Sequence, residues 1–408
     1  MINSNSNNIY LDYNATTPCA PEVLDAMLPF FNGHYGNPAS IHARGREALR
    51  AVEEARCYIG YALNVASQDI VFTSGATESN CMILSGITQR QQNRRRIVIG
   101  AGEHKSILEP CHWLQEIGFI VEQIPLTRLG VVSVSEAERL ITDETLLVSI
   151  QGANNETGVL QPVKAIADLA RLRGAFMHCD ATQMPGKVSV ALDDMGVDYA
   201  SVSAHKVYGP KGIGACYIRG GSPRSALTPL LRGGGQESEL RAGTLNVPGI
   251  VGFGKACQLI TSTLDHDSER VRSLRDHFEM RIHDLCPDSI VIGELTKRLA
   301  GTSCIILVGV PSDILLARVN DLCISSGSAC SSGSVSPSHV ILSCGYSREN
   351  ARSTIRVSFG RYSTFEEAEY AAVRLADCAN AIRDDLARIP KRNVAKKQEQ
   401  CDDAGGVS

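Results

Sequence analysis

Three features are missing from this sequence: paired cysteines, long apolar runs and an excess of charge of one sign. None of the 14 cysteines forms a CxxC pair, so neither a disulfide framework nor a zinc site with the usual spacing is expected. No apolar run reaches the roughly 18 residues of a membrane helix, and the chain does not open on a basic segment followed by an apolar one. The formal charge of −4 gives no strong attraction to nucleic acid or to anionic membranes. We therefore expect a cytoplasmic protein without a membrane span, direct nucleic-acid contact or a resident metal.

Short apolar runs alternate with amphipathic stretches between about residues 70 and 220, which predicts an α/β fold with a mostly parallel sheet. In such sheets, ligands bind beyond the carboxyl ends of the strands. Each expected strand ends in small or polar residues, so functional residues are expected there. The expected strands are DIVFTSG (69–75), RIVIGAG (96–102), TLLVSIQG (145–152), AFMHCDA (175–181) and YASVSAH (199–205).

The length of 408 residues favours two domains. Two long helical patterns run from about 247 to 286, and we place the domain change inside them. After them, two strands (302–309 and 354–360) and two helices (312–320 and about 364–387) predict a smaller α+β unit. The expected division is a large domain over 15–262, a small domain over 1–14 and 263–388 with a mobile Ser/Gly loop at about 325–337, and a disordered tail over 389–408.

Lys206 follows the last of the expected strands, in the stretch SAHKVYGPKG. A lysine at a strand end can be desolvated enough to act as an amine nucleophile and to form a Schiff base. The alternative is an ordinary surface lysine, and this stretch by itself leaves both readings open.

Two further strand ends carry polar residues. FTSGATESN passes from a strand into a helix, so its first N–H groups and Thr77 could hold a phosphate, although the same pattern also fits an ordinary helix N-cap. Asp180 ends the strand in HCDATQ, with Gln183 three residues later. A carboxylate there needs a cationic or N–H partner, either a structural salt bridge or the ring nitrogen of pyridoxal phosphate. The combination with Lys206 favours the cofactor.

Cys330 lies in SSGSACSSGS, a run of small and polar residues. Such a composition predicts a flexible tether that cannot bury enough apolar surface to hold one conformation. A structural cysteine would be out of place there, so the thiol is expected to have a chemical role.

With these residues the chain resembles the cysteine desulfurases, the NifS/IscS branch of the pyridoxal-phosphate enzymes. The similarity covers about residues 9 to 388. It implies the aspartate-aminotransferase type of pyridoxal-phosphate-dependent transferase fold (fold type I), pyridoxal 5′-phosphate as cofactor and a homodimer. The motifs that carry it are YLDYNATTP, GNPAS, VFTSGATESN, EHKSIL, ANNETGVLQP, DATQMPGK, SAHKVYGPKG, RAGTLN, SSGSACSSGS, SPSHV and TIRVSFGR.

The resemblance also implies roles for individual residues. Lys206 would bind the cofactor covalently, Asp180 would pair with its ring nitrogen, and His104 would stack on the ring and move protons. Arg356 would hold the α-carboxylate of the substrate, a task suited to its planar fork of donors. Asn155 would contact both cofactor and substrate. The other cofactor-binding positions implied are Ala76, Thr77, Gln183, Ser203 and His205, with Thr244 contributed by the neighbouring subunit.

The implied reaction converts L-cysteine to L-alanine. Lys206 would remove the α-proton, and the Cys330 thiolate would then attack the substrate sulfur and keep it as a persulfide. A free thiol with a pKa near 8.5 is only a few per cent ionised at pH 7, and His104 is the candidate to take its proton. Cys330 is also a candidate transient ligand of an iron-sulfur cluster.

The sulfur would pass to an acceptor protein that serves iron-sulfur cluster assembly, tRNA thiolation or DNA phosphorothioation. The segment after Ile389 lacks the ending by which housekeeping relatives dock a cluster scaffold, so the sequence leaves the acceptor open. Two other classes stay as alternatives. One is a different pyridoxal-phosphate enzyme, such as an aminotransferase or selenocysteine lyase, in which Cys330 is incidental. The other is a catalytically idle subunit that only binds partners.

Overall fold

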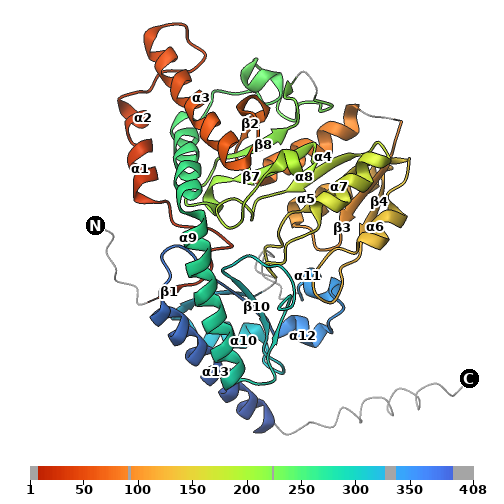
Figure 1. The fold of residues 1–408 in the computed structure, drawn as a ribbon, viewed down its shortest axis with the longest axis vertical. Helices are drawn as coiled ribbons and strands as arrows, with labels where there is room; N and C mark the ends of the chain where they lie inside the picture. Colours follow the sequence, from red (N-terminus) through yellow and green to blue (C-terminus); the bar gives the residue numbers. More distant parts are fainter. Residues whose placement is uncertain (1–7, 91–92, 223–224, 327–336, 389–408) are drawn as a thin grey trace, which may run out of the picture.

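The computed structural model describes residues 8–90, 93–222, 225–326 and 337–388. The molecule has a larger and a smaller part, and a single long helix runs through both (Figure 1). Most of the expected Ser/Gly loop, including Cys330, and all of the expected tail over 389–408 lie outside these ranges.

The larger part is built on a seven-stranded sheet with the order β2-β8-β7-β6-β5-β3-β4. Neighbouring strands from β4 to β7 are parallel, whereas β8 runs antiparallel to both β7 and β2. The mostly parallel α/β sheet expected from the sequence is confirmed. The strands are β2 (Ile70–Thr73), β3 (Arg96–Gly100), β4 (Ile120–Ile124), β5 (Thr145–Gln151), β6 (Phe176–Asp180), β7 (Tyr199–Ser203) and β8 (Gly214–Ile218).

The sequence analysis did not identify strands β4 and β8. β4 is an edge strand, and only the last of its five residues is buried, so its apolar pattern is weak. β8 begins with Gly214 and Ala215, two residue types that are depleted in strands. Only its pairing between β2 and β7 makes this segment a strand.

Helices cover both faces of the large sheet. Successive residues of a strand point to opposite faces, and β3 shows the result: Ile97 and Ile99 pack in the cluster of helices α4 and α5, whereas Val98 packs in the cluster of α3, α7 and α9. The helices of this part are α1 (Pro21–Met27), α2 (Pro29–Asn32), α3 (Ala43–Leu63), α4 (Ala76–Arg90), α5 (Lys105–Glu116), α6 (Val134–Leu140), α7 (Val163–Leu172) and α8 (Leu192–Met195).

The smaller part has an antiparallel sheet with the order β12-β13-β10-β9 and a parallel pair formed by β1 and β11. The β1 pairing brings the N-terminal segment back to this part of the molecule. Its elements are β1 (Ile9–Tyr10), β9 (Ile290–Val291), β10 (Thr302–Ile306), α10 (Ser312–Arg318), β11 (Leu322–Cys323), β12 (Ser325–Ser326), α11 (His339–Ser343), α12 (Arg348–Arg352), β13 (Thr354–Ser358) and α13 (Phe365–Arg388).

Helix α9 (Val247–Leu285) is one continuous helix of 39 residues, so the expectation of two separate helical patterns was wrong. The apolar pattern along α9 is interrupted because the helix packs against one core in its first half and another in its second half, and not because the chain turns. Ile260 belongs to the core of the larger part, whereas Val271 belongs to the core of the smaller part. This change of partners supports the proposed domain division between residues 262 and 263.

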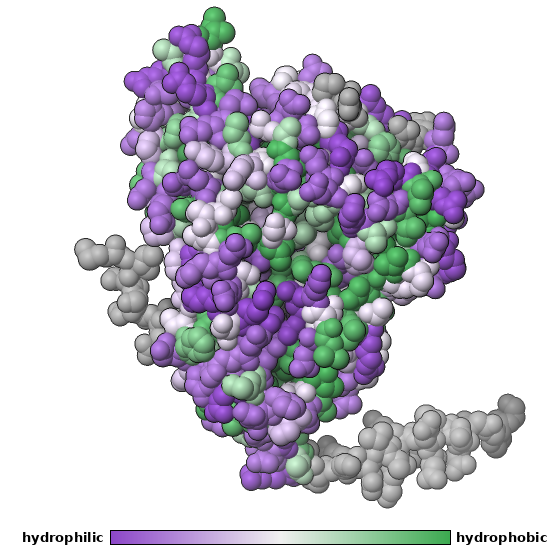
Figure 2. Space-filling model, in the orientation of Figure 1, coloured by the Kyte–Doolittle hydropathy of each residue, from purple (hydrophilic) through white to green (hydrophobic). Residues whose placement is uncertain are grey.

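Hydrophilic and hydrophobic residues are interspersed over the face shown in Figure 2. None of the helices in the described ranges combines the length and the apolar character needed to cross a membrane. The twelve cysteines within these ranges are all free. The same ranges contain no group of three or more His, Cys, Asp or Glu side chains placed to hold a metal ion.

Candidate active site

The carboxyl ends of β2, β3, β5, β6 and β7 lie at the same edge of the sheet, because β8 is the only strand of the seven that runs the opposite way. The segments after these ends carry most of the candidate residues. Topology alone therefore brings together residues that are more than one hundred positions apart in the chain. They are Ala76 and Thr77 after β2, His104 after β3, Asn155 after β5, Asp180 at the end of β6 and Lys206 after β7.

Lys206 ends the short helix η2 (Ala204–Lys206) that follows β7. Its Nζ donates hydrogen bonds to the main-chain oxygens of Asn14, at 2.6 Å, and Ala15, at 2.9 Å. The side chain is thus held against the N-terminal segment of the chain. This contact does not fit the alternative of an ordinary solvated surface lysine.

Asn14 connects three polar side chains of the site. Its main-chain oxygen also accepts from Nε2 of Gln183 at 2.9 Å, and its Oδ1 accepts from Nζ of Lys187 at 2.9 Å. Its Nδ2 donates to Oγ1 of Thr302, at 2.9 Å, in the smaller part of the molecule. Burial, reinforced by the positive charge of Lys206, holds the pKa of Lys187 well below its usual range. Asn14 therefore contacts both Lys206 and Lys187, and its bond to Thr302 ties these lysines to the smaller part of the molecule.

Asp180 is a buried carboxylate whose partners are N–H groups. Its Oδ2 accepts from Nδ2 of Asn80 at 3.0 Å, and its Oδ1 accepts from the main-chain N–H of Thr182 at 3.1 Å. Within the described residues no lysine, arginine or histidine forms an ion pair with it, so the structural salt bridge considered from the sequence is not observed. A buried carboxylate with neutral partners suits a ligand that brings a positive charge.

His104 is the N-cap residue of helix α5. Its Nδ1 accepts from the main-chain N–H of Ser106 at 3.1 Å and lies 2.8 Å from the hydroxyl of the same residue. That hydroxyl accepts in turn from Nδ2 of Asn80 at 2.8 Å. Burial lowers the pKa of His104; the charge of Asp180 opposes this shift, and that of Lys206 adds to it. His104 is thus linked to Asp180 through Asn80 and Ser106.

The first turn of α4 has the properties of an anion site. No acceptor lies within hydrogen-bond distance of the main-chain N–H groups of Ala76 and Thr77 among the described residues. A Cβ placed on Gly75 would lie 3.6 Å from Oγ of Ser203, so that hydroxyl faces the same turn. The Thr77 side chain is exposed. Free N–H groups at the start of a 15-residue helix, beside a hydroxyl, suit a phosphate.

The alternative prediction for this turn, an ordinary helix N-cap, is also partly correct, because the main-chain N–H of Ser74 donates to Oε2 of Glu78 at 2.7 Å. The cap uses an N–H that precedes the helix and leaves the first helical N–H groups available. Nδ1 of His205, the residue before Lys206, lies 3.1 Å from Oγ1 of Thr16. Burial, with Lys206 next in effect, lowers the pKa of His205 to about 4, so this imidazole is neutral at physiological pH.

Arg356 projects from β13 toward Asn155. Its Nη1 donates to the main-chain oxygen of Asn155 at 3.0 Å, and its Nη2 donates to Oδ1 of Asp12 at 2.6 Å and to Oγ of Ser325 at 3.1 Å. Its Nε is buried and has no partner among the described residues. An unpaired buried N–H is costly, and a substrate carboxylate would satisfy it. The pairing with Asp12 was not foreseen from the sequence.

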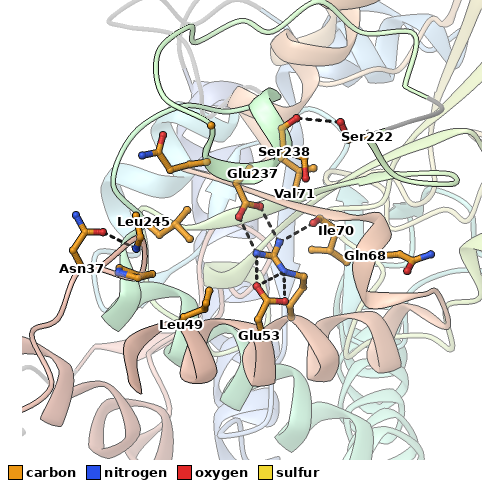
Figure 3. A pocket seen from close by; sticks show the side chains of 15 residues that line it. Asn37, Leu49, Glu53, Gln68, Ile70, Val71, Ser222, Glu237, Ser238 and Leu245 are labelled. Carbon is orange, nitrogen blue, oxygen red and sulfur yellow. Dashed lines mark hydrogen bonds and ion pairs between the residues drawn. The ribbon is translucent and has the colours of Figure 1, made fainter. Parts of the chain in front are cut away.

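Thr244 lies apart from these residues, in an exposed segment between η4 (Gln236–Glu239) and α9. Two ion pairs hold η4 and this segment against the rest of the chain. Arg56 binds Glu237 at 2.8 Å, and Arg241 binds Glu78 of helix α4, also at 2.8 Å. Figure 3 shows Glu237 and Glu53 converging at the wall of a separate pocket of about 550 Å³. Within the described ranges, no hydrogen bond or ion pair joins Thr244 to the other candidate residues.

The structure thus links most of the predicted residues through a few contacts, but Cys330 lies outside the described residues. Four polar residues at the centre of the site were missed: Asn14, Asn80, Ser106 and Lys187. Each lies in a motif that carries the family resemblance, and Asn80 also ends the stretch FTSGATESN in which only the first N–H groups and Thr77 were expected to take part. A polar residue within three positions of an expected strand end, or one helical turn into the following helix, was the signal available for Asn80 and Ser106.

Comparisons with known proteins agree with this arrangement. The Aminotransferase class-V family matches residues 9–370. The chain is 40% identical over 378 residues to the cysteine desulfurase IscS of Rickettsia felis, covering 92% of both chains. A solved NifS-like protein superimposes with a TM-score of 0.85 at 35% identity, over 92% of this chain and 100% of the other. A structure described as SspA in complex with cysteine superimposes with a TM-score of 0.77 at 35% identity, over 87% and 99% of the two chains.

Proposed function

The chain belongs to the aminotransferase class-V family and, within it, to the cysteine desulfurases, and on this premise we propose that it takes the sulfur of L-cysteine onto Cys330, releases L-alanine and passes the sulfur to an acceptor protein. Its cofactor is pyridoxal 5′-phosphate. The aminotransferase and selenocysteine lyase alternatives are not favoured, since curated relatives that are 40% and 42% identical over 92% of this chain are cysteine desulfurases.

The observation that carries the proposal is the buried carboxylate of Asp180, which has N–H partners but no cation, at the same sheet edge as Lys206. These residues fit pyridoxal phosphate, which supplies an electron sink for the electron pair released at the α-carbon of the substrate. Asp180 would face its ring nitrogen, and Lys206 would hold it covalently. The free N–H groups of Ala76 and Thr77, with Ser203 and His205, would hold its phosphate. Gln183 and Asn155 are the proposed neighbours of the ring.

Arg356 is the proposed anchor of the substrate carboxylate. Its unpaired Nε offers one donor, and Asp12 and Asn155 fix the plane of the guanidinium group. A planar fork held in this way orients the α-carbon of L-cysteine relative to the amine of Lys206. Lys206 is the proposed base for the α-proton, because its amine is fixed by two main-chain oxygens instead of by bulk water.

The transfer of sulfur balances without an external oxidant. The C–S bond of L-cysteine breaks and an S–S bond forms to Cys330, while the carbon that loses sulfur gains a proton. The carbon is reduced and the pair of sulfurs is oxidised, so L-cysteine and a thiol give L-alanine and a persulfide. The reaction needs the thiolate of Cys330 and one proton donor at the substrate carbon.

A homodimer is part of the proposal. Thr244 is exposed on a segment that its own subunit holds in place, so it could reach the cofactor phosphate of a second copy. Two apolar residues near the N-terminal helices are also exposed, Phe31 of α2 at 63% and Ile41, which lies just before α3, at 90%. Exposed apolar residues that lie close together in a monomer favour an interface. Light scattering should give twice the chain mass, and a monomeric mass would contradict this part.

The acceptor is proposed to be a protein of iron-sulfur cluster assembly, tRNA thiolation or DNA phosphorothioation. Radioactive sulfur from L-cysteine, followed from the purified persulfide into one candidate acceptor of each kind, would identify it. Transfer to none of the three would contradict this part of the proposal and leave the desulfurase step standing.

The central test is to incubate the holoenzyme with L-cysteine and to measure its intact mass with and without a thiol reductant. We expect a reductant-sensitive adduct of one sulfur together with L-alanine, and no adduct on Cys330→Ser. An adduct that persists in Cys330→Ser would overturn the role of this cysteine. Absence of both adduct and L-alanine in the wild type would overturn the proposed function.

A further inference from the structure

We propose that Asn80 and Ser106 are positioning residues that fix His104 as the tautomer with its proton on Nε2, so that the neutral imidazole enters the reaction with an N–H that donates a hydrogen bond to the substrate. The sequence analysis expected His104 to act instead as the base for Cys330. The tautomer follows from contacts within this chain, whereas its use in catalysis rests on the proposed function.

The main-chain N–H of Ser106 settles the state of Nδ1. An amide N–H can only donate, and this one points at Nδ1 of His104 at 3.1 Å. A proton on Nδ1 would set two N–H groups against each other. Nδ1 is therefore an acceptor, and in a neutral imidazole the proton must then sit on Nε2.

The hydroxyl of Ser106 supplies a second donor. It accepts from Nδ2 of Asn80 at 2.8 Å, and its own hydrogen is then free to point at Nδ1 of His104, also at 2.8 Å. Asn80 is oriented in turn by Asp180, because an ionised carboxylate can only accept and so selects the NH₂ end of the amide, at 3.0 Å. The donors therefore run in one direction, from Asn80 through Ser106 to His104.

Helix α5 disfavours a second proton on the ring. His104 caps a helix of 12 residues, and the positive end of the helix dipole opposes a positive charge on Nδ1. Burial lowers the pKa of His104 in the same sense, as do the charges of Lys206 and Lys105, and only Asp180 acts against them. His339 also lies near this ring, and burial lowers its pKa as well. The imidazole is thus neutral around pH 7.

Nε2 has no hydrogen-bond partner among the described residues. It is the nitrogen left for substrate, and it carries an N–H. Taking a proton from Cys330 would require an empty nitrogen, which the neutral ring lacks at Nε2. Donating a hydrogen bond from the Nε2–H to the substrate needs no change of tautomer, and it leaves the imidazole neutral.

The test is nitrogen NMR of the holoenzyme with labelled histidine. His104 is one of ten histidines, and its signals are assigned by their loss in His104→Gln. We expect unprotonated Nδ1 and protonated Nε2 at about pH 7 to 8. A protonated Nδ1 in the wild type would overturn the proposal. This result does not depend on desulfuration, so it separates the proposal from a failure of the proposed function, which would appear as no L-alanine from the wild type.

The positioning role is tested with Ser106→Ala and Asn80→Ala. Each removes the hydroxyl donor to Nδ1 or its orientation but keeps the main-chain N–H, so the Nδ1 signal should shift while the proton stays on Nε2, and kcat for L-alanine formation should fall about fivefold, the effect of one lost hydrogen bond, while KM changes little. Ser106→Thr, which keeps the hydroxyl, should restore both readouts. Thr88→Ala is the matched control, because Thr88 is a buried polar residue on the helix of Asn80 that bonds only to its own helix. An unchanged Nδ1 signal and wild-type kcat in both alanine variants would overturn the role of Asn80 and Ser106.

Discussion

The main-chain oxygen of Asn14 lies 2.6 Å from Nζ of Lys206 and accepts its hydrogen bond, although 192 positions separate the two residues in the chain. The same asparagine binds the smaller part of the molecule through Thr302. The lysine that carries the proposed chemistry is therefore positioned by a residue of the N-terminal segment, not by its own strand alone.

Asn14→Ala should lower kcat/KM for L-alanine formation about tenfold. The substitution removes the side-chain bonds to Lys187 and Thr302, so the main-chain oxygen that holds Lys206 loses its support. Steady-state L-alanine release measures the effect. Asn320→Ala is the control, because Asn320 is exposed; equal rates for the two variants would show that Asn14 does not position Lys206.

Arg356→Lys should raise KM for L-cysteine by about 10- to 100-fold with a smaller effect on kcat. Lysine keeps the charge but loses the planar fork and the Nε donor. Arg318→Lys is the control, since Arg318 forms a half-exposed ion pair with Asp385 on the surface. If KM for L-cysteine stays at the wild-type value in Arg356→Lys, the substrate carboxylate binds elsewhere.

Glu156 should make the wild-type protein less stable as the pH rises from about 4.5 to 7. Burial raises the pKa of this carboxyl to about 7, although the hydrogen bond from Ser338 and the charges of Arg356 and Lys105 oppose the shift. The folded state then binds a proton that the unfolded state has already lost, so stability falls across this window and levels off above it. The thiols of Cys304 and Cys344 also lie near Glu156, and burial raises the pKa of each.

Glu156→Gln should therefore stabilise the protein at pH 8 by up to about 3 kcal/mol and change little near pH 5. Glutamine can still accept the bond from Ser338, which measures 2.5 Å in the wild type, so the link between the two parts of the molecule is kept. Denaturant unfolding at both pH values gives the result. Equal stability of the two proteins at pH 8 would mean that Glu156 titrates normally.

Arg56→Met should destabilise the fold by about 3 to 5 kcal/mol, because it leaves the buried carboxylate of Glu237 without its cation. The two side chains also provide hydrogen-bond partners for main-chain groups at the unpaired edge of β2. Arg56 donates to the main-chain oxygen of Ile70, and Glu237 accepts from the N–H of Phe72.

The matched control is Arg139→Met, which breaks an exposed ion pair with Glu136 within one helix and should cost under about 1 kcal/mol. Thermal and denaturant unfolding of both variants compare the two pairs. Similar losses for both would show that the edge of β2 does not depend on Arg56 and Glu237.

Three features were predictable from the sequence: the α/β class, the strands that bear the site, and the order of phosphate cradle, carboxylate and lysine along the chain. These features are local: a strand needs only its apolar run, and Asp180 and Lys206 follow such runs directly. The unbroken course of α9 and the strand β8 were missed because each depends on which core the segment packs against.

Only the tertiary structure decided how the side chains pair. The donors from Asn80 to His104 join residues of two helices, Arg356 meets Asp12 from the other end of the chain, and Asn14 reaches Lys206. Hydrogen bonds depend on distances of about 3 Å and on direction, and the spacing of residues in a sequence specifies neither across separate elements. The residue types that the chemistry needs can be found in the sequence, whereas the state in which each one works depends on neighbours that folding brings to it.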